Sequence, residues 1–313
     1  MELNEKLEPV YIFLAIILGL LLSNIKILTN LGDPILTLSL ALMLFALFLE
    51  IPLKDIKKSF TNTKYTTISL LINFLWTPLF GYFLAKIFLT GSVDLQIGFF
   101  MLILTPCTDW YLLFTKIAKG DVSLNLSILP VNLILQLILL PTYLLIFYSK
   151  TNTLNILNLG YSLLIFIIIP FTLAQIFKKI NKTHVNLIKN KIIDFQMLFL
   201  AIAIFALFLS QGENLFTNIN TLYTLFIPII LFFTVNFLLD FIISKQVKFK
   251  YSEYASLSLT TLARNSPLAL AIAVKSFPNN QLIPLALVIG PLIELPVLYI
   301  ISKTLLKIKK YYK

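Results

Sequence analysis

Residues 104–114 read LTPCTDWYLLF, and residues 261–271 read TLARNSPLALA. Each stretch lies in the middle of an apolar run of about 20 residues, which is long enough to cross a hydrocarbon core of roughly 30 Å. In each run a proline stands beside polar residues, and proline removes a backbone donor and clashes with the carbonyl four residues earlier. Both runs are therefore predicted to be membrane helices that break near Pro106 and Pro267.

The composition predicts an all-α polytopic membrane protein. Of 313 residues, 58% are hydrophobic and 12% are charged, with a mean hydropathy of +0.92, whereas soluble domains carry about 25% charged residues. Apolar runs recur along the whole chain, so residues 1–313 are predicted to form a single membrane domain. A phosphate-binding GxxxxGK[ST] loop does not occur in the sequence, and a chain with one histidine and one cysteine is a poor candidate for structural zinc. We expect no cofactor and no enzymatic activity.

Polar interruptions divide the chain into ten predicted spans. They lie near residues 9–28, 33–50, 66–89, 97–118, 123–148, 156–177, 192–210, 221–244, 254–275 and 281–304. Five spans in each half give two repeats, about 9–148 and 156–304, that must insert with opposite topology. The interrupted spans four and nine occupy matching positions, and in such inverted repeats broken helices bind substrate near the bilayer midplane. We expect them to cross there.

The basic residues predict the orientation. One set of connections, together with the two termini, holds 20 lysines, and the other set holds four. The positive-inside rule then places both termini in the cytoplasm of a multi-pass plasma-membrane protein. The net charge of +11 is explained by this bias, so a nucleic-acid partner is not expected. Residues 1–10 lack a basic n-region and a cleavage site, so the first helix is expected to be retained.

Four chemically active side chains are predicted at similar depth. Cys107 and Asp109 lie about half-way along span four, Arg264 about half-way along span nine, and Glu294 in the middle of span ten. Ionised groups at this depth cost several kcal/mol and usually face one another or a water-filled cavity. Because a guanidinium binds carboxylates well, we expect Arg264 to lie within reach of Asp109 or Glu294.

Each of these features has a structural alternative. A membrane proline can be a simple kink, and the three charges can be an ion-pair network that locks helices together. Cys107 can be a small buried hydrophobic residue. Asn132 and Gln136 give span five an amide-lined face, for which helix–helix hydrogen bonding is the alternative. Asp240 is expected near a helix end, solvated and outside the site.

The chain resembles the arsenical-resistance permeases of the bile acid:sodium symporter superfamily. The resemblance rests on PCTDW with KIAKGD at residues 106–121, NLILQ at 132–136 and IGPLIELPVL at 289–298. It implies ten helices, a core domain in which helices four and nine cross, and a panel of spans one, two, six and seven that moves against this core. Arsenical permeases carry a functional cysteine after the fourth-helix proline, which matches Cys107.

One departure concerns the coupling ion. Sodium-coupled relatives usually have a glutamate and a glutamine shortly before the ninth-helix asparagine, where this chain has Thr260 and Arg264. A guanidinium there should repel sodium. With Asp109 and Glu294 opposed by one arginine, one negative charge is left over, and burial favours its protonated form. We therefore expect proton coupling, with Glu294 as the proton carrier.

The leading hypothesis is efflux of arsenite or antimonite by proton exchange. Cys107 would be the soft ligand of the arsenic or antimony atom, with Thr108, Arg264 and Asn265 completing the substrate site. One alternative is a carrier of a small organic or inorganic anion that binds Arg264, possibly sodium-coupled. A second alternative is a non-transporting receptor or scaffold, which would gain nothing from costly midplane charges.

Overall fold

The computed structural model describes residues 3–50, 60–107, 110–151, 153, 156–180, 191, 195–217, 219–310 and 312. Within these ranges the chain is almost entirely helical, and the one β-type feature is an isolated bridge between Pro106 and Arg264. Six described helices are long and apolar enough to cross a membrane, and four further apolar helices are shorter. The chain is thus an all-helical polytopic membrane protein, as its composition predicts.

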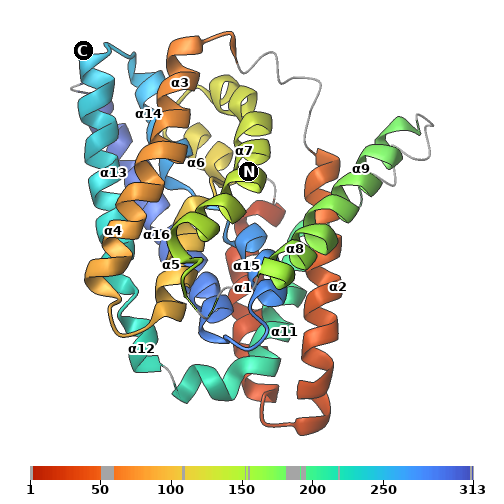
Figure 1. Cartoon of the computed structure of the whole chain (residues 1–313). Helices are drawn as coiled ribbons and strands as arrows, with labels where there is room; N and C mark the ends of the chain where they lie inside the picture. The colour runs from red at the N-terminus through yellow and green to blue at the C-terminus, as the bar shows by residue number, and fades with distance from the viewer. Residues whose placement is uncertain are drawn as a thin grey trace. The chain divides into compact units, whose positions relative to one another are not determined.

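The described helices follow the ten predicted spans (Figure 1). The first five are α1 (Leu3–Leu22), α2 (Lys26–Glu50), α3 with η2 and α4 (Thr63–Leu71, Ile72–Trp76, Thr77–Phe88), α5 with α6 (Val93–Leu104, Trp110–Ile117) and α7 (Val122–Tyr148). The second five are α8 with η3 and α9 (Ile156–Leu163, Leu164–Ile168, Ile169–Lys179), α11 (Gln196–Thr217), α13 (Phe226–Gln246), α14 with α15 (Tyr251–Leu262, Ser266–Ser276) and α16 (Leu282–Lys309). A short helix, α12 (Ile219–Tyr223), precedes α13.

The boundary between the first two spans differs from the prediction. Helix α1 ends at Leu22, six residues earlier than expected, and α2 already begins at Lys26. The turn is made by Ser23 and Asn24, residue types that favour turns because their side chains bond to nearby backbone; the Ser23 hydroxyl donates to Leu20 O at 2.7 Å. Helix α2 then continues through Pro34, so this proline does not mark the start of a span.

The helices fall into two compact units. Unit 1 comprises residues 1–51, 155–221 and 270–281, and it contains α1, α2, α8, α9 and α11. Its core is formed by α1 and α2 packed on α11. At Gly32 an added Cβ would lie 2.7 Å from Ser210 Cβ, so a residue without a side chain is needed for this close approach. These are the spans that the resemblance assigns to a panel, together with the end of span nine.

Unit 2 comprises residues 52–154, 222–269 and 282–313. Here α5 packs against α4 and α16, and α13 packs against α14. The contact of α5 with α16 is close because Gly98 faces Ala286 and the Ile283 carbonyl. All of the predicted site residues that the structure describes belong to this unit.

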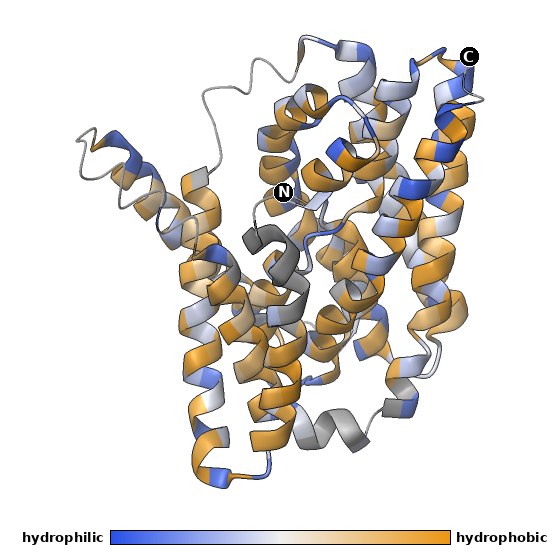
Figure 2. Ribbon diagram, turned by 180° about the vertical axis from the view of Figure 1, so that it is seen from behind, coloured by the Kyte–Doolittle hydropathy of each residue, from blue (hydrophilic) through white to orange (hydrophobic). Residues whose placement is uncertain are grey.

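Most of the residues in the helices are hydrophobic (Figure 2). Along α3, η2 and α4 an exposed stripe repeats every four residues, as expected for one face of a helix in lipid. Its members are Leu71, Leu75, Leu79, Phe83 and Ile87. The polar residues of the same span, including Asn73 and Thr77, are buried. The span therefore has an apolar face that is exposed and a polar face that is buried.

Candidate functional site

The fourth span breaks at the predicted place. Helix α5 ends at Leu104, and Thr105 adopts an extended backbone with φ −100° and ψ 102°. Pro106 follows in an extended segment, and the next described helix, α6, begins at Trp110. Because proline cannot donate a backbone hydrogen bond and disfavours helix in the preceding residue, this sequence ends the first half-helix.

The ninth span breaks before its proline rather than at it. Helix α14 ends at Leu262, Ala263 is extended with φ −70° and ψ 137°, and α15 begins at Ser266. Pro267 is the second residue of α15, where a backbone N–H has no intrahelical partner. The predicted reason for the break, loss of a hydrogen bond at Pro267, was therefore wrong: this proline starts the second half-helix.

The two breaks cross and pair with each other through their backbones. Pro106 forms an antiparallel bridge with Arg264. The Cys107 N–H donates to Ala263 O at 2.9 Å, and the Asn265 N–H donates to Thr105 O at 2.6 Å. Unpaired backbone groups are costly inside a membrane, so each break supplies the partners that the other lacks.

Arg264 connects the ends of two half-helices. Its side chain is buried, with 2% of its surface exposed. Nη1 donates to Ile103 O at 3.0 Å and Nε to Leu262 O at 3.3 Å. These carbonyls belong to the last turns of α5 and α14, which carry the negative ends of the helix dipoles. The guanidinium also lies 4.9 Å from the centre of the Phe232 ring.

Glu294 binds the backbone of the same residue. The carboxyl group, 3% exposed, accepts a hydrogen bond at Oε1 from the Arg264 backbone N–H at 2.7 Å. The expected contact between Arg264 and Glu294 is therefore present, but this hydrogen bond comes from the main chain and not from the guanidinium. The other expected partner, Asp109, and the neighbouring Thr108 lie outside the described residues, so their roles stay predictions.

The space between these groups is small. A cavity of about 10 Å³ is lined by Arg264, Glu294, Phe232 and neighbouring apolar side chains. A cavity needs roughly 10–15 Å³ to hold one water molecule. In this conformation the Arg264–Glu294 site can accommodate about a single water, so a larger ligand requires the site to open.

Cys107 and Asn265 flank the bridge. Cys107 is the single cysteine of the chain, with 4% of its surface exposed, and its backbone is fixed by Ala263. The Asn265 side chain accepts from the Leu268 N–H at 3.1 Å, which makes it a cap of α15. No group of three His, Cys, Asp or Glu side chains within the described ranges could hold a metal ion.

Asn132 and Gln136 are buried on α7 with no hydrogen-bond partner for their side chains among the described residues. An unsatisfied buried polar group costs about 1–3 kcal/mol. Asn125, about two turns before Asn132 on the same helix, has partners for both of its side-chain atoms. Its Oδ1 accepts from the Tyr65 hydroxyl, and its Nδ2 donates to Thr115 Oγ1 and Ser256 O. The two free amides therefore have capacity for water or a ligand, which simple helix–helix bonding would have consumed.

Asn73 is a site residue that the sequence analysis missed. It lies in the π-helical turn η2, and such turns are frequent at functional sites. Its Oδ1 accepts from Arg264 Nη2 at 3.3 Å, and its Nδ2 donates to Thr260 O at 3.4 Å. Pro78 frees the carbonyl of Phe74, which accepts from the Tyr143 hydroxyl. The available signal was an asparagine four residues before the Thr77–Pro78 pair in an otherwise apolar span.

Asp240 was placed wrongly. Its side chain is completely buried and accepts at Oδ2 from the Thr261 hydroxyl at 2.6 Å. Counting residues from the helix end suggested a solvated carboxylate, but the neighbouring helix α14 covers it. Asn236, one turn earlier on α13, accepts from Trp76 Nε1 at 2.8 Å. Span eight therefore contributes buried polar groups to the interior of unit 2.

Crossed half-helices, with a buried arginine at their carbonyl ends and a polar interior, are features of membrane carriers. Residues 37–218 match the model of the Sodium Bile acid symporter family, and the chain belongs to this family. It is therefore a multi-pass secondary transporter.

Curated relatives extend over most of the chain. The arsenical-resistance protein Acr3 of Corynebacterium glutamicum is 26% identical, with 94% of this chain and 86% of the relative covered. Acr3 of Alkaliphilus metalliredigens is 23% identical, covering 84% of this chain and 78% of its own length. The uncharacterized protein YbaS of Bacillus subtilis is 22% identical, with 81% and 83% covered.

Proposed function

We propose that the protein exports trivalent arsenic or antimony from the cell in exchange for protons. The observation that carries the proposal is the crossing itself, which fixes Cys107, the single thiol of the chain, one residue from the Pro106–Arg264 bridge. Support comes from the two relatives named as arsenical-resistance proteins. Trivalent arsenic binds soft sulfur ligands, so a thiol at the midplane suits this substrate.

The binding step needs no oxidant. The Cys107 thiol displaces one hydroxyl group of arsenous acid, so that one As–S bond forms, one As–O bond breaks and one water leaves with the thiol proton. Thr108, the next residue in the sequence, and Asn265 are the proposed oxygen donors. Reversal of the same exchange on the other side of the membrane releases arsenous acid. Because the Arg264–Glu294 site has room for about one water, loading requires an opened conformation.

Arg264 supports protons rather than sodium as the coupling ion. Carbonyl ends of half-helices are groups that bind Na⁺ in secondary transporters. In this chain the Arg264 guanidinium donates hydrogen bonds to the carbonyls of Ile103 and Leu262 at these ends. A fixed positive charge at that point opposes a second cation through Coulomb repulsion. Glu294 is the proposed proton carrier, because the hydrogen bond at its Oε1 comes from the neutral backbone N–H of Arg264 and not from the charged guanidinium.

The proposed orientation places both termini in the cytoplasm of the plasma membrane, because the lysines gather on that side. Reporter fusions at the two ends test this placement. A cytoplasmic reporter such as green fluorescent protein should fluoresce at both ends, and a periplasmically active phosphatase should be silent at both.

Everted membrane vesicles test the transport proposal. We expect wild-type vesicles to accumulate arsenite without sodium when the lumen is acidic, and to lose accumulation when an ionophore collapses the pH gradient. Cys107→Ser, which keeps the size of the side chain, should abolish accumulation. Strict sodium dependence, or full activity of Cys107→Ser, would rule out this mechanism.

A second candidate is a carrier of a small organic or inorganic anion, possibly coupled to sodium. It is favoured by the family match and by the buried positive charge of Arg264. In that case Cys107→Ser would retain transport, whereas Arg264→Gln would lose it. Testing both variants with arsenite and with a bile-acid analogue in the same vesicles separates the two functions.

A further inference from the structure

The buried carboxyl group of Asp240 has no role in the mechanism described so far. It lies inside α13 with no exposed surface. Within the described residues its one side-chain hydrogen bond is the Thr261 hydroxyl at Oδ2, and Oδ1 has no partner. An ionised carboxylate supported by one hydroxyl is expensive within a membrane, whereas binding of a proton removes the charge.

The charged and titratable groups that act on Asp240 come from the neighbouring helices. Arg264 follows the end of α14, Tyr65 lies on α3, and Tyr254 lies on α14. The guanidinium of Arg264 bonds to Ile103 O, Leu262 O and Asn73. Its hydrogen bonds therefore do not neutralise Asp240 directly, although its charge acts at a distance.

Further buried hydroxyl groups without partners lie on α13, on α14 and on α3, which packs against α14. Ser69 on α3, Ser244 on α13 and Thr260 on α14 are buried, and their hydroxyl oxygens have no partner among the described residues. Buried polar groups in proteins are normally bonded to other groups or to ordered water. Since α14 packs against both α3 and α13, we expect water molecules between these three helices.

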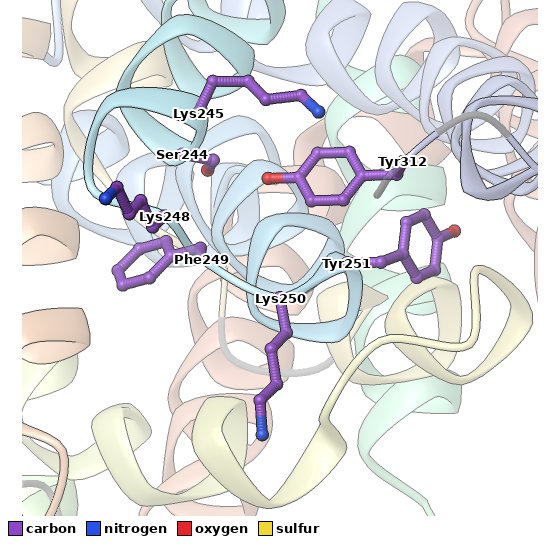
Figure 3. Close-up of a pocket in the computed structure, with 7 residues that line it drawn as sticks. All are labelled: Ser244, Lys245, Lys248, Phe249, Lys250, Tyr251 and Tyr312. Atoms are coloured by element: carbon purple, nitrogen blue, oxygen red, sulfur yellow. The ribbon is translucent and has the colours of Figure 1, made fainter.

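This polar interior extends outward to an open cavity of about 460 Å³, lined by Ser244, Lys245, Lys248, Phe249, Lys250, Tyr251 and Tyr312. Figure 3 shows the Tyr312 hydroxyl turned toward Ser244. Ser244 stands four residues after Asp240 on the same helix, and residues at this spacing are neighbours on one face. Asp240 is thus one helical turn inside the wall of the cavity.

The inner end of the polar interior reaches the transport site. Thr261, which bonds Asp240, lies three residues before Arg264. Asn73 connects Arg264 with the end of α14, because its side chain bonds both Arg264 Nη2 and Thr260 O. Glu294 in turn holds the Arg264 N–H. Polar groups therefore connect Glu294 with the wall of the Ser244 cavity.

We propose that Asp240 is a second proton-binding residue, through which protons pass between the Arg264–Glu294 site and the cavity lined by Ser244. The proposal rests on the proposed proton exchange. Each transfer moves one proton from one carboxylic acid to water and from water to the next carboxylate, so that no other reactant is needed. Thr261 orients the carboxyl group by its hydrogen bond to Oδ2.

Infrared spectroscopy of the full-length protein in lipid tests Asp240 without any substrate. A pH titration should show a C=O stretching band of a protonated carboxylic acid that is absent in Asp240→Asn and retained in Glu294→Gln. Thr261→Val removes the hydrogen bond to Oδ2, so it should shift the frequency of that band. A set of titrating bands unchanged in Asp240→Asn would overturn the proposal.

Transport measurements then separate this proposal from the proposed function. Asp240→Asn should lose arsenite accumulation driven by a pH gradient, at least tenfold, while retaining arsenite–arsenite exchange at equal pH. Full pH-driven accumulation in this variant would refute the role of Asp240. If the wild type does not transport arsenite but the Asp240 band titrates as expected, the substrate is wrong and the proton site stands.

Access from the cavity can be tested by cysteine labelling. Ser244 and Ala46 are both buried, but only Ser244 is among the residues that line this cavity. In a Cys107→Ser background, Ser244→Cys should therefore react with a small water-soluble methanethiosulfonate, whereas Ala46→Cys in α2 should not. Labelling at position 244 supports the water route. An unreactive Ser244→Cys in a protein that folds normally would contradict it.

Discussion

The carboxyl group of Glu294 holds the backbone N–H of Arg264 at 2.7 Å, while the guanidinium of Arg264 bonds the carbonyls of Ile103 and Leu262 at the ends of α5 and α14. One residue therefore links span ten to both broken helices through two different groups. Changes at Glu294 should act on the charge of the site, whereas changes at Arg264 should act on the crossing itself.

Glu294→Gln should separate charge from structure. The amide oxygen can still accept from the Arg264 N–H, so we expect the variant to fold with near wild-type thermal stability. It cannot release a proton, and proton-driven arsenite accumulation should fall at least tenfold. Uptake by everted vesicles over a range of external pH measures this loss. Wild-type accumulation in Glu294→Gln would show that another group carries the proton.

Arg264→Ala should be the most damaging single change at the site. It leaves the carbonyls of Ile103 and Leu262 without their donor, and each buried polar group left unsatisfied costs about 1–3 kcal/mol. Arg264→Lys keeps the charge but cannot bond Ile103 O, Leu262 O and Asn73 with one planar group, so we expect an intermediate loss. Thermal unfolding in detergent and vesicle uptake measure both variants, and normal stability with normal transport in Arg264→Ala would show that the network has no role.

Asn73→Ala should weaken the same network from span three. It removes the acceptor of Arg264 Nη2 and the donor to Thr260 O, and the expected destabilisation is about 1–3 kcal/mol. Asn24→Ala, at an exposed turn, is the matched control and should be neutral. Unfolding temperatures of the two variants measure the contribution of Asn73 to stability. Equal values would exclude a structural role for Asn73.

Gly98→Ala should disturb the packing of α5 on α16. The added Cβ would meet Ala286 Cβ at 2.8 Å and Ile283 O at 3.1 Å, and overpacking of this kind costs about 1–3 kcal/mol. Gly91→Ala provides the control, because an added Cβ there meets nothing within 4 Å. Ala286→Gly in the Gly98→Ala background should recover part of the lost stability, and a failure to recover any would point to the Ile283 carbonyl as the limiting contact.

The sequence was sufficient for most of the spans and for the approximate places of the two breaks, because apolar length acts locally. It was insufficient for the end of α1 and for the role of Pro267, which lies in the first turn of α15. It was also insufficient for the partners of Arg264. A charge at midplane depth suggested a carboxylate as the hydrogen-bond partner of the guanidinium, yet the converging carbonyls of Ile103 and Leu262 take this place. Carbonyl ends become available only once two half-helices meet, and that meeting involves residues more than 150 positions apart.

Asn73 was missed, and Asp240 was wrongly expected to be solvated, for a related reason. Helical periodicity is weak in spans that are apolar on every side, so the buried face of α13 could not be identified from its residues. The π-helical turn at Asn73 also shifts the facing of the side chains that follow it. Burial of both residues depends on contacts between helices that are distant in sequence. In contrast, the exposed stripe along span three needed no such contacts.

The crossing of spans four and nine is built from main-chain hydrogen bonds at Thr105, Cys107, Ala263 and Asn265. Such bonds are made by every amino acid except proline at a donor position. The side chains of these four residues can therefore change without loss of the joint. A lineage that replaces Cys107 can acquire a new cargo on an unaltered scaffold, so divergence of cargo specificity within this fold requires few substitutions.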